Sequence, residues 1–284
     1  MSLGGPGVQA AIDDLYIHHP GAIVAEIAAQ RRRHTRRFRI TFVVTWILLV
    51  GGLVGFLVAG GKIDSVFLSK WGGYILGGVG TTVFVAVCSV SVAICFAVVG
   101  ALGRLSSNSV LFAVSTLYVS LVRGTPLIVQ ILFIYLALPQ IWSGFAEIPA
   151  IALGVFALSF NYGAYMTETF RAGIQAVPRG QTEAAEALGM PSRTRMQRII
   201  LPQAVRIITP AIGNEFISMI KDSALVSYIA VPELLWRAQR VGQSNFRTLE
   251  TLLLAAGVYW ALTIVLSLFQ DRLEKRMAES DRRI

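Results

Sequence analysis

Charged residues are scarce in this chain of 284 residues. Asp, Glu, Lys and Arg make up only 14% of it, and 55% of the residues are hydrophobic, whereas soluble domains carry about 25% charged residues. An ordinary soluble domain is therefore excluded. Several apolar runs reach the length of about 20 residues that crosses a bilayer, and they are continuous rather than alternating, which disfavours a β-barrel. We predict an all-α polytopic membrane protein.

Cysteine is nearly absent. Cys88 and Cys95 lie seven positions apart on one apolar helix, so about 10 Å separates them, which is too far for a disulfide. No metal-ligand spacing is present, and the three histidines all lie within the first 34 residues. The apolar runs also lack a nucleophile–base pair. We expect neither a metal site nor a catalytic site in this chain.

The chain also lacks the Gly-x-x-x-x-Gly-Lys-Ser/Thr loop that cradles ATP phosphates, so no bound cofactor is expected. No cleavable signal peptide is evident. The first apolar run begins at Ile40, follows a basic cluster and is about 21 residues long. These features are typical of a retained span.

Positive charge is in excess, with a net charge of +9. No basic patch is interleaved with aromatic residues, which argues against a nucleic-acid partner. The basic residues instead flank apolar runs, as they do in membrane proteins with a fixed orientation. With the N-terminus inside, 19 of the 25 Lys and Arg residues face the cytoplasm. This asymmetry predicts about six spans, with both termini cytoplasmic.

The predicted spans are about residues 40–60, 73–103, 125–138, 149–170, 202–221 and 249–270. Residues 109–122 carry several Ser and Thr, so we expect a helix against the inner leaflet, with Arg123 near the cytoplasmic boundary because a charge in the bilayer centre is costly. A single long tilted helix is the alternative. Residues 222–247 are mixed, and we expect short helices there on the outer side.

One polar block, residues 183–202, lies between predicted spans. Thr182 is suited to cap a helix, with Glu183 and Glu186 in its first turn. Gly189 suits a left-handed turn that ends the helix, and Pro191 can begin the next one. The alanines between them allow close approach of another surface. The block thus reads as a cytoplasmic helix–turn–helix, either an ordinary loop or a docking element.

The spacing of this block resembles the signature of the membrane subunits of bacterial ABC importers. Three further stretches, residues 122–130, 162–173 and 214–225, resemble the polar amino acid branch of that family. The resemblance covers about residues 72–271. It implies that the following residues couple the permease to an ATPase: Glu183, Ala184, Ala185, Glu186, Gly189, Met190, Arg193, Ile199, Leu201 and Pro202.

The resemblance implies a division into four parts. Residues 1–39 form a cytoplasmic tail, 40–70 an extra span and external loop, 71–271 the permease domain with coupling helices at about 181–200, and 272–284 a second tail. It also implies two cytoplasmic ATPase subunits that bind ATP and Mg, a second permease that is a copy of this chain or a different one, and an extracytoplasmic amino-acid-binding protein.

Polar residues within the later spans are candidates for the substrate pathway, because ionisable groups inside a membrane usually serve a function. We predict a pathway lined by Asn161, Tyr162, Asn214, Glu215, Ser218, Lys221, Asp222 and Ser223. In the alternative interpretation, Glu215 pairs with a base on a neighbouring span and only holds the two helices together. Glu168 and Arg171 are three apart and should pair on one helix, and Arg123 is assigned to lipid phosphate or to Glu168.

Two functions follow from these features. The first is the permease of an ATP-driven importer of polar amino acids, whose exact substrate the sequence leaves open. The alternative is an ion-coupled secondary transporter, with which an intramembrane Glu215 and the interrupted helix at Pro210 are compatible. The complete 183–202 signature favours the first.

Overall fold

The computed structural model describes residues 20–281, with side chains from 37 to 277. Every regular element in this range is helical. The chain divides into two compact units, with the boundary between Asp64 and Ser65. This boundary falls within the predicted external loop that follows the first span, in the part 40–70.

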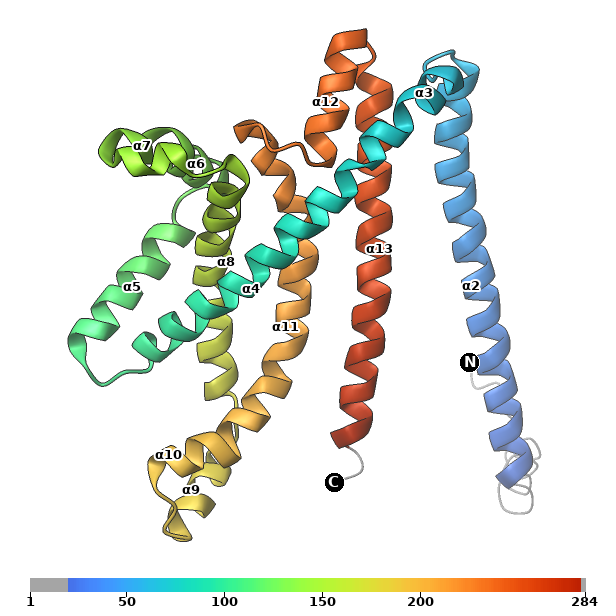
Figure 1. The fold of residues 1–284 in the computed structure, drawn as a ribbon. Helices are drawn as coiled ribbons and strands as arrows, with labels where there is room; N and C mark the ends of the chain where they lie inside the picture. The colour runs from blue at the N-terminus through green and yellow to red at the C-terminus, as the bar shows by residue number, and fades with distance from the viewer. Residues whose placement is uncertain (1–19, 282–284) are drawn as a thin grey trace, which may run out of the picture. The chain divides into compact units, whose positions relative to one another are not determined.

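The first unit is built on one 40-residue helix, α2, Pro20–Ala59 (Figure 1). Its segment Arg37–Ala59 is long and apolar enough to cross a membrane, close to the predicted span 40–60. Helix α2 continues through the basic run without a break, because no Pro or Gly interrupts residues 22–50.

Four helical segments pass the length and apolarity test for a membrane span, and a fifth does if a bent pair is counted as one. These are Arg37–Ala59, Ser65–Arg104, Ala150–Gln175, Thr248–Met277, and the pair Ser109–Arg123 with Leu127–Ile141. They contain α3 (Ser65–Leu76), α4 (Gly78–Arg104), α8 (Ala150–Gln175) and most of α13 (Thr248–Asp281). The predicted count of about six is thus close to what the described residues show.

The remaining predicted span corresponds to α11, Leu201–Asp222. It does not pass the test, since it carries Arg206, Glu215 and Lys221 among other polar residues. Its 22 residues would extend about 33 Å, enough for a bilayer core. Length therefore supports the prediction, although composition alone does not.

The alternative of one long helix through Arg123 is wrong. Helix α5 ends at Arg123, helix α6 (Leu127–Leu132) begins after Pro126, and the two directions differ by 106°. Pro126 has no N–H to donate and its ring disfavours helical geometry in the residue before it. Beyond α6 the chain forms η1 (Phe133–Ala137), α7 (Leu138–Ile141) and η2 (Ser143–Glu147).

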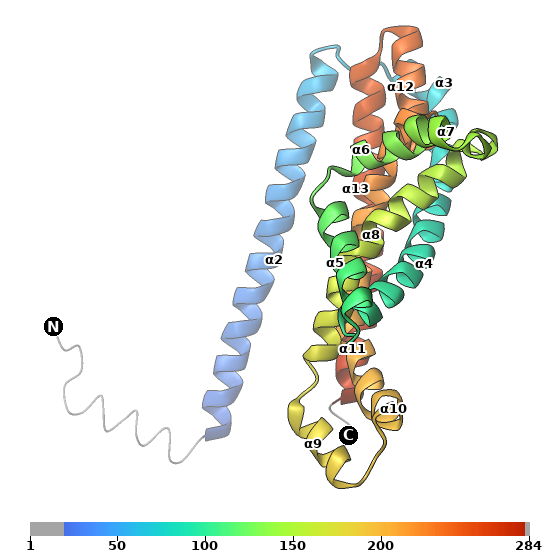
Figure 2. The ribbon, with the colours of Figure 1, turned by 90° about the vertical axis from the view of Figure 1, so that its left-hand side faces the viewer.

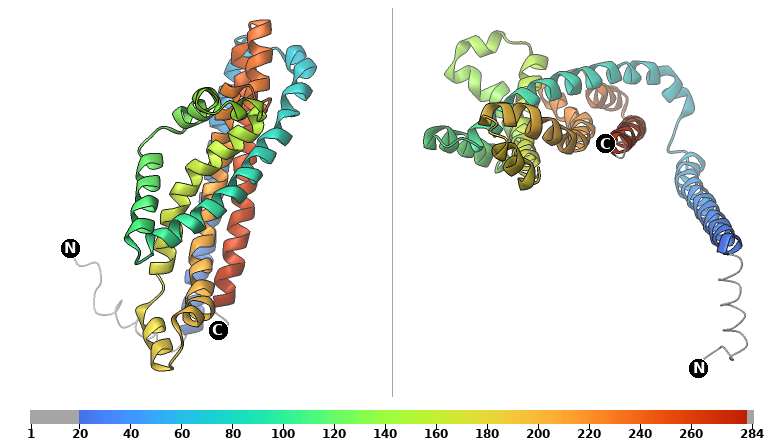
Figure 3. Two further views of the ribbon diagram at one scale, coloured as in Figure 1. Left: turned by 60° about the vertical axis from the view of Figure 1, so that its left-hand side comes forward. Right: turned by 90° about the horizontal axis from the view of Figure 1, so that it is seen from below.

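The centre of the second unit is the crossing of α4 and α8, which run obliquely across each other (Figures 1 and 3). Small residues permit their close approach: a Cβ on Gly100 would lie 2.2 Å from Thr167 Oγ1, and one on Gly163 would lie 2.5 Å from Phe96 Cβ. Such contacts are the usual means of packing helices in a membrane. The crossing holds α8 rigidly against α4.

Short helices join α11 to α13, as predicted for residues 222–247. They are η4 (Ser223–Ile229) and α12 (Leu234–Asn245). Glu233 precedes α12, is fully buried, and accepts hydrogen bonds from the Trp236 N–H at 2.7 Å and the hydroxyls of Thr82 and Tyr259. This carboxyl therefore ties α12 to α4 and α13.

Candidate functional site

The 183–202 block forms a helical hairpin at the end of the second unit opposite α12 (Figures 1 and 2). It comprises α9 (Arg179–Ala187), α10 (Ser192–Arg195) and η3 (Met196–Ile200), which leads into α11. Ile200 packs with Val177, Ala204 and Ile208 in one apolar cluster. That cluster fixes the base of the hairpin to the end of α8.

The predicted cap of this hairpin is wrong by four residues, because the N-cap is Pro178 and not Thr182. Helix α9 begins at Arg179 after Pro178, so Thr182 lies inside the helix and caps nothing. Glu183 and Glu186 are consequently beyond the first turn. Proline can precede a helix because its fixed φ suits the entry and the first N–H groups need no helical partner.

The predicted turn at Gly189 is confirmed. Gly189 has φ +70°, and its N–H donates to the Glu186 carbonyl at 2.9 Å. The Met190 N–H donates to the Ala185 carbonyl at 3.0 Å. This pair of bonds is a Schellman motif, which glycine adopts without the strain that a side chain would bring.

The hairpin presents a mostly exposed surface. Glu183, Ala184, Gly189, Arg193 and Pro202 are exposed, whereas Ala185 is buried against the base. Glu186 is also exposed but pairs with Arg195 across the hairpin. Leu188, at the tip, is 81% exposed, and sequence reasoning missed it.

A second feature is a polar cavity of about 450 Å³ beside the break between α5 and α6. It is lined by Arg123, Gly124, Thr125, Pro126, Leu127, Asn161, Tyr162, Tyr165, Glu215 and Asp222. Four of these, Asn161, Tyr162, Glu215 and Asp222, were predicted for the substrate pathway. Asn161 and Tyr162 lie near the middle of α8, so the cavity is at half the length of that helix.

The other predicted pathway residues do not line this cavity. Asn214 and Lys221 are exposed elsewhere on α11, and Ser218 is half-buried outside the lining. Ser223 is buried and donates its hydroxyl to the Ile220 carbonyl at 2.7 Å. The helical period explains the division, because Glu215 and Asp222 are seven apart and share a face, while Asn214 and Lys221 lie on the next one.

Two polar bridges shape the wall of the cavity. The Tyr162 hydroxyl donates to Asp222 Oδ2 at 2.7 Å. The Asn161 amide donates to Gln130 Oε1 at 3.1 Å, and the Gln130 amide in turn donates to the Val122 carbonyl at 2.8 Å. Gln130 therefore holds the broken α5–α6 segment against α8. It fell inside a stretch that resembled the family, but no spacing rule singled it out.

Two charges in this cavity have no close partner. Within residues 37–277, neither Glu215 nor Arg123 makes a hydrogen bond or a salt bridge; the Arg123 guanidinium lies over the Tyr165 ring, 5.2 Å from its centroid. The predicted pairing of Arg123 with Glu168 is wrong. Arg123 lies beside residues at the middle of α8, in the polar cavity that the break after it opens. A polar cavity lowers the cost of a charge in a membrane protein.

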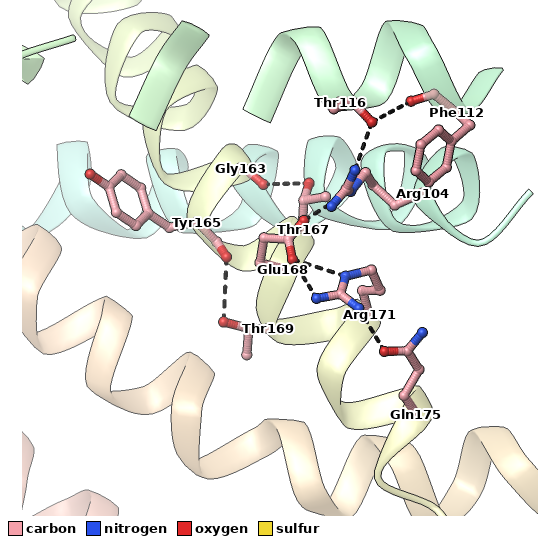
Figure 4. Close-up of polar contacts among 10 residues, drawn as sticks. All are labelled: Arg104, Phe112, Thr116, Gly163, Tyr165, Thr167, Glu168, Thr169, Arg171 and Gln175. Carbon is pink, nitrogen blue, oxygen red and sulfur yellow. Dashed lines mark hydrogen bonds and ion pairs between the residues drawn. The ribbon is translucent and has the colours of Figure 1, made fainter. Parts of the chain in front are cut away.

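Glu168 pairs with two other arginines (Figure 4). Arg171 lies on the same helix, 2.7 Å away through its Nη2, as its spacing predicted. Arg104, at the end of α4, donates from Nε to Glu168 Oε1 at 3.0 Å and from Nη1 to the Thr116 hydroxyl at 2.6 Å. No sequence pattern links Arg104 to Glu168, since 64 residues separate them.

This network joins three helices near the hairpin. Arg104 belongs to α4, Thr116 to α5 and Glu168 to α8, and the C-terminal end of α8 leads directly into α9. Helix α5 ends at Arg123 in the cavity wall. The hairpin and the cavity are therefore connected through one closely packed, hydrogen-bonded group of helices.

Residues 93–279 match the model of the family described as binding-protein-dependent transport system inner membrane component. The chain belongs to this family. Among its relatives is the arginine transport system permease protein ArtQ of Bacillus subtilis, 36% identical over 73% of this chain and 94% of ArtQ. Another is the L-cystine transport system permease protein TcyB of the same organism, 39% identical over 75% of this chain and 90% of TcyB.

The fold agrees with this membership. The crystal structure titled as an amino acid ABC transporter with histidines contains a chain that is 37% identical, with a TM-score of 0.71, and the match covers 75% of this chain and 99% of that one. This permease is thus a multi-pass inner-membrane component of an ABC importer rather than an ion-coupled secondary transporter. The uncovered quarter is about as long as the first unit, residues 1–64.

Proposed function

We propose that this permease imports a polar amino acid by alternating access, driven by ATP hydrolysis in partner subunits. The observation that carries the proposal is the polar cavity at half the length of α8, which contains two charges without close partners and is connected to an exposed hairpin. Its volume of about 450 Å³ is in the range of small-molecule sites.

The cavity suits a zwitterion. The Arg123 guanidinium can donate two hydrogen bonds to an α-carboxylate. The carboxylates of Glu215 and Asp222 can accept hydrogen bonds from an ammonium group. Because Tyr162 already donates to Asp222, Glu215 is the acid free to bind a second cation. This arrangement favours an amino acid with a net positive charge over an acidic one. The relatives named for arginine and cystine transport are consistent with a polar substrate.

The hairpin supplies the coupling. Residues 179–200 would seat in a groove of a cytoplasmic ATPase subunit, with Leu188 at the tip and Glu183 and Arg193 beside it. Two ATPase subunits, which bind ATP and Mg, would act on this chain and on a second permease. An extracytoplasmic binding protein would deliver the substrate. The excess of basic residues on the hairpin side supports cytoplasmic termini.

Uptake by proteoliposomes tests the proposal. The assembled transporter, with its ATPase and binding protein, should accumulate labelled amino acid only when ATP is supplied on the side of the membrane where the ATPase subunits lie. Glu215→Gln and Arg123→Gln should each reduce uptake at least tenfold, since each leaves one substrate charge unpaired, while Glu147→Gln, at an exposed site remote from the cavity, should not. Uptake driven by an ion gradient without ATPase would refute the mechanism.

Coupling needs a separate measurement. Gly189→Val forces a side chain into a left-handed turn, at a cost of about 1–2 kcal/mol, whereas Gly180→Val on the same hairpin meets open space at an ordinary φ. Gly189→Val and Glu183→Arg should weaken ATPase binding and substrate-stimulated hydrolysis while substrate still binds. Unchanged hydrolysis in both variants would exclude the hairpin as the coupling element.

A further inference from the structure

The N-terminal unit contains a dense basic run that the transport function does not use. Residues 31–39 read Arg-Arg-Arg-His-Thr-Arg-Arg-Phe-Arg. They lie within α2, Pro20–Ala59, and the next charged residue along the chain is Lys62. The six arginines therefore end where the apolar, membrane-crossing segment begins.

The positions of these residues surround the helix. At about 100° per residue, the six arginines and His34 leave no gap wider than about 80° around the axis of α2. The run also extends about 12 Å along that axis at 1.5 Å per residue. A protein partner contacts one face of a helix, whereas a layer of lipid headgroups surrounds it on every side. We call residues 31–39 the basic collar.

The end of α13 offers a contrast within the same chain. Arg272, Lys275 and Arg276 lie at the C-terminal end of the membrane-crossing segment Thr248–Met277, and their spacing of three and four residues places them on one side of the helix. Residues 271–277 also contain two acids, whereas residues 31–39 contain none. The two ends therefore differ both in net charge and in the distribution of charge around the helix.

We propose that the basic collar binds the headgroups of anionic phospholipids, with phosphatidylglycerol as the simplest example. Each arginine near an anionic surface contributes roughly fivefold in affinity, and guanidinium groups pair with phosphate oxygens through two donors. Arg37 and Arg39, the last two of the run, are exposed, as is the apolar segment that follows.

The collar lies outside the part of the chain that matches the family model, which begins at residue 93. The proposed lipid site is consequently a property of this chain's extension and does not depend on the transport mechanism. It would persist if the assigned substrate were wrong.

Lipid titration of the full-length permease, purified with its partner subunits in neutral detergent, tests the collar. Native mass spectrometry would count bound short-chain phosphatidylglycerol and, in parallel, phosphatidylcholine. Wild type should bind phosphatidylglycerol at least tenfold more tightly than phosphatidylcholine. The triple variant Arg31→Gln/Arg33→Gln/Arg36→Gln should lose more than about tenfold in affinity for phosphatidylglycerol, and raising salt from 0.05 to 0.5 M should have a similar effect.

Two matched variants sharpen the result. Arg272→Gln/Lys275→Gln/Arg276→Gln removes the same charge from α13 and should change phosphatidylglycerol affinity less than about threefold. Reversing the order of residues 31–39 keeps both the charge and the circumferential spread, so its lipid affinity should match wild type. The proposal would be overturned if the two triple variants lost equal affinity for phosphatidylglycerol, or if the reversed variant lost affinity. Loss in the reversed variant would indicate a partner that contacts one face of the helix.

Discussion

Replacing Glu168 with glutamine removes the charge that holds α4 and α8 together near the coupling hairpin. Glu168 accepts from Arg104 Nε at 3.0 Å and from Arg171 Nε at 2.9 Å. Hydrogen bonds to charged groups contribute about 1.5–3 kcal/mol each. The three side chains are 19–29% exposed, so solvent screening reduces that figure, and about 1 kcal/mol per bond is a reasonable estimate.

The variant should therefore lose about 2 kcal/mol of stability, which corresponds to a fall in the thermal midpoint of roughly 4–8 °C for a domain of this size. Thermal unfolding of the detergent-purified permease measures it. Glu147→Gln is the matched control, because Glu147 is exposed and has no salt-bridge partner among the described side chains.

A double-mutant cycle with Arg104→Gln separates the pair from general effects. If the contact between α4 and α8 matters, the two substitutions together should cost less than the sum of each alone, by about 0.5–3 kcal/mol. A Glu168→Gln midpoint equal to that of Glu147→Gln, or strictly additive losses in the cycle, would refute the assignment of this network as the joint between hairpin and cavity.

Three further outcomes follow. Gly78→Val should lower the thermal midpoint strongly, because a Cβ there would lie 2.7 Å from the backbone of Leu234, whereas Gly80→Val on the same helix, in open space, should not. Burial raises the pKa of the Glu233 carboxyl above 4.5, so just above that pH the folded state binds more protons than the unfolded state. The wild type should therefore lose stability relative to Glu233→Gln as the pH rises from 4.5. Thermal unfolding of both proteins over this pH range measures the difference. Tyr162→Phe removes the hydrogen bond to the cavity aspartate and should weaken substrate affinity several-fold in equilibrium binding assays, without changing helix content by circular dichroism.

Much of the fold is predictable from local sequence. Apolar length fixes the spans at 37–59, 150–175 and 248–277 to within a few residues of their predicted ends, apart from the longer last helix. The break after Arg123 follows from Pro126, and the left-handed turn follows from Gly189. Each of these depends on residues close together in the chain.

The cavity and the polar network are less predictable, because they depend on contacts between distant residues. Glu215 and Asp222 are a local, seven-residue pair, and their shared face is foreseeable. Arg123 was expected to pair with lipid phosphate or with Glu168, whereas the break in the helix places it in a polar cavity. Arg104 and Gln130 acquire their roles only when α8 packs against them.

The start of the hairpin shows a different limitation. Thr182 followed by glutamate is a favourable N-cap sequence, yet the helix begins earlier, with Pro178 as its N-cap. Several nearby residues can serve as a helix start, and the apolar cluster of Val177 with Ile200 selects among them by tertiary packing. Local capping preference is too small, about 1 kcal/mol, to override it.

The unwound stretch 124–126 borders the cavity. Gly124 has no side chain to delete, and a Cβ there would approach the Ser120 carbonyl within 2.8 Å, so alanine at this position adds a contact instead of removing one. Alanine scanning therefore cannot measure what the peptide groups here contribute to solute recognition. Amide-to-ester substitution at Gly124 and Thr125 tests their N–H groups, whereas Pro126 has no N–H to replace.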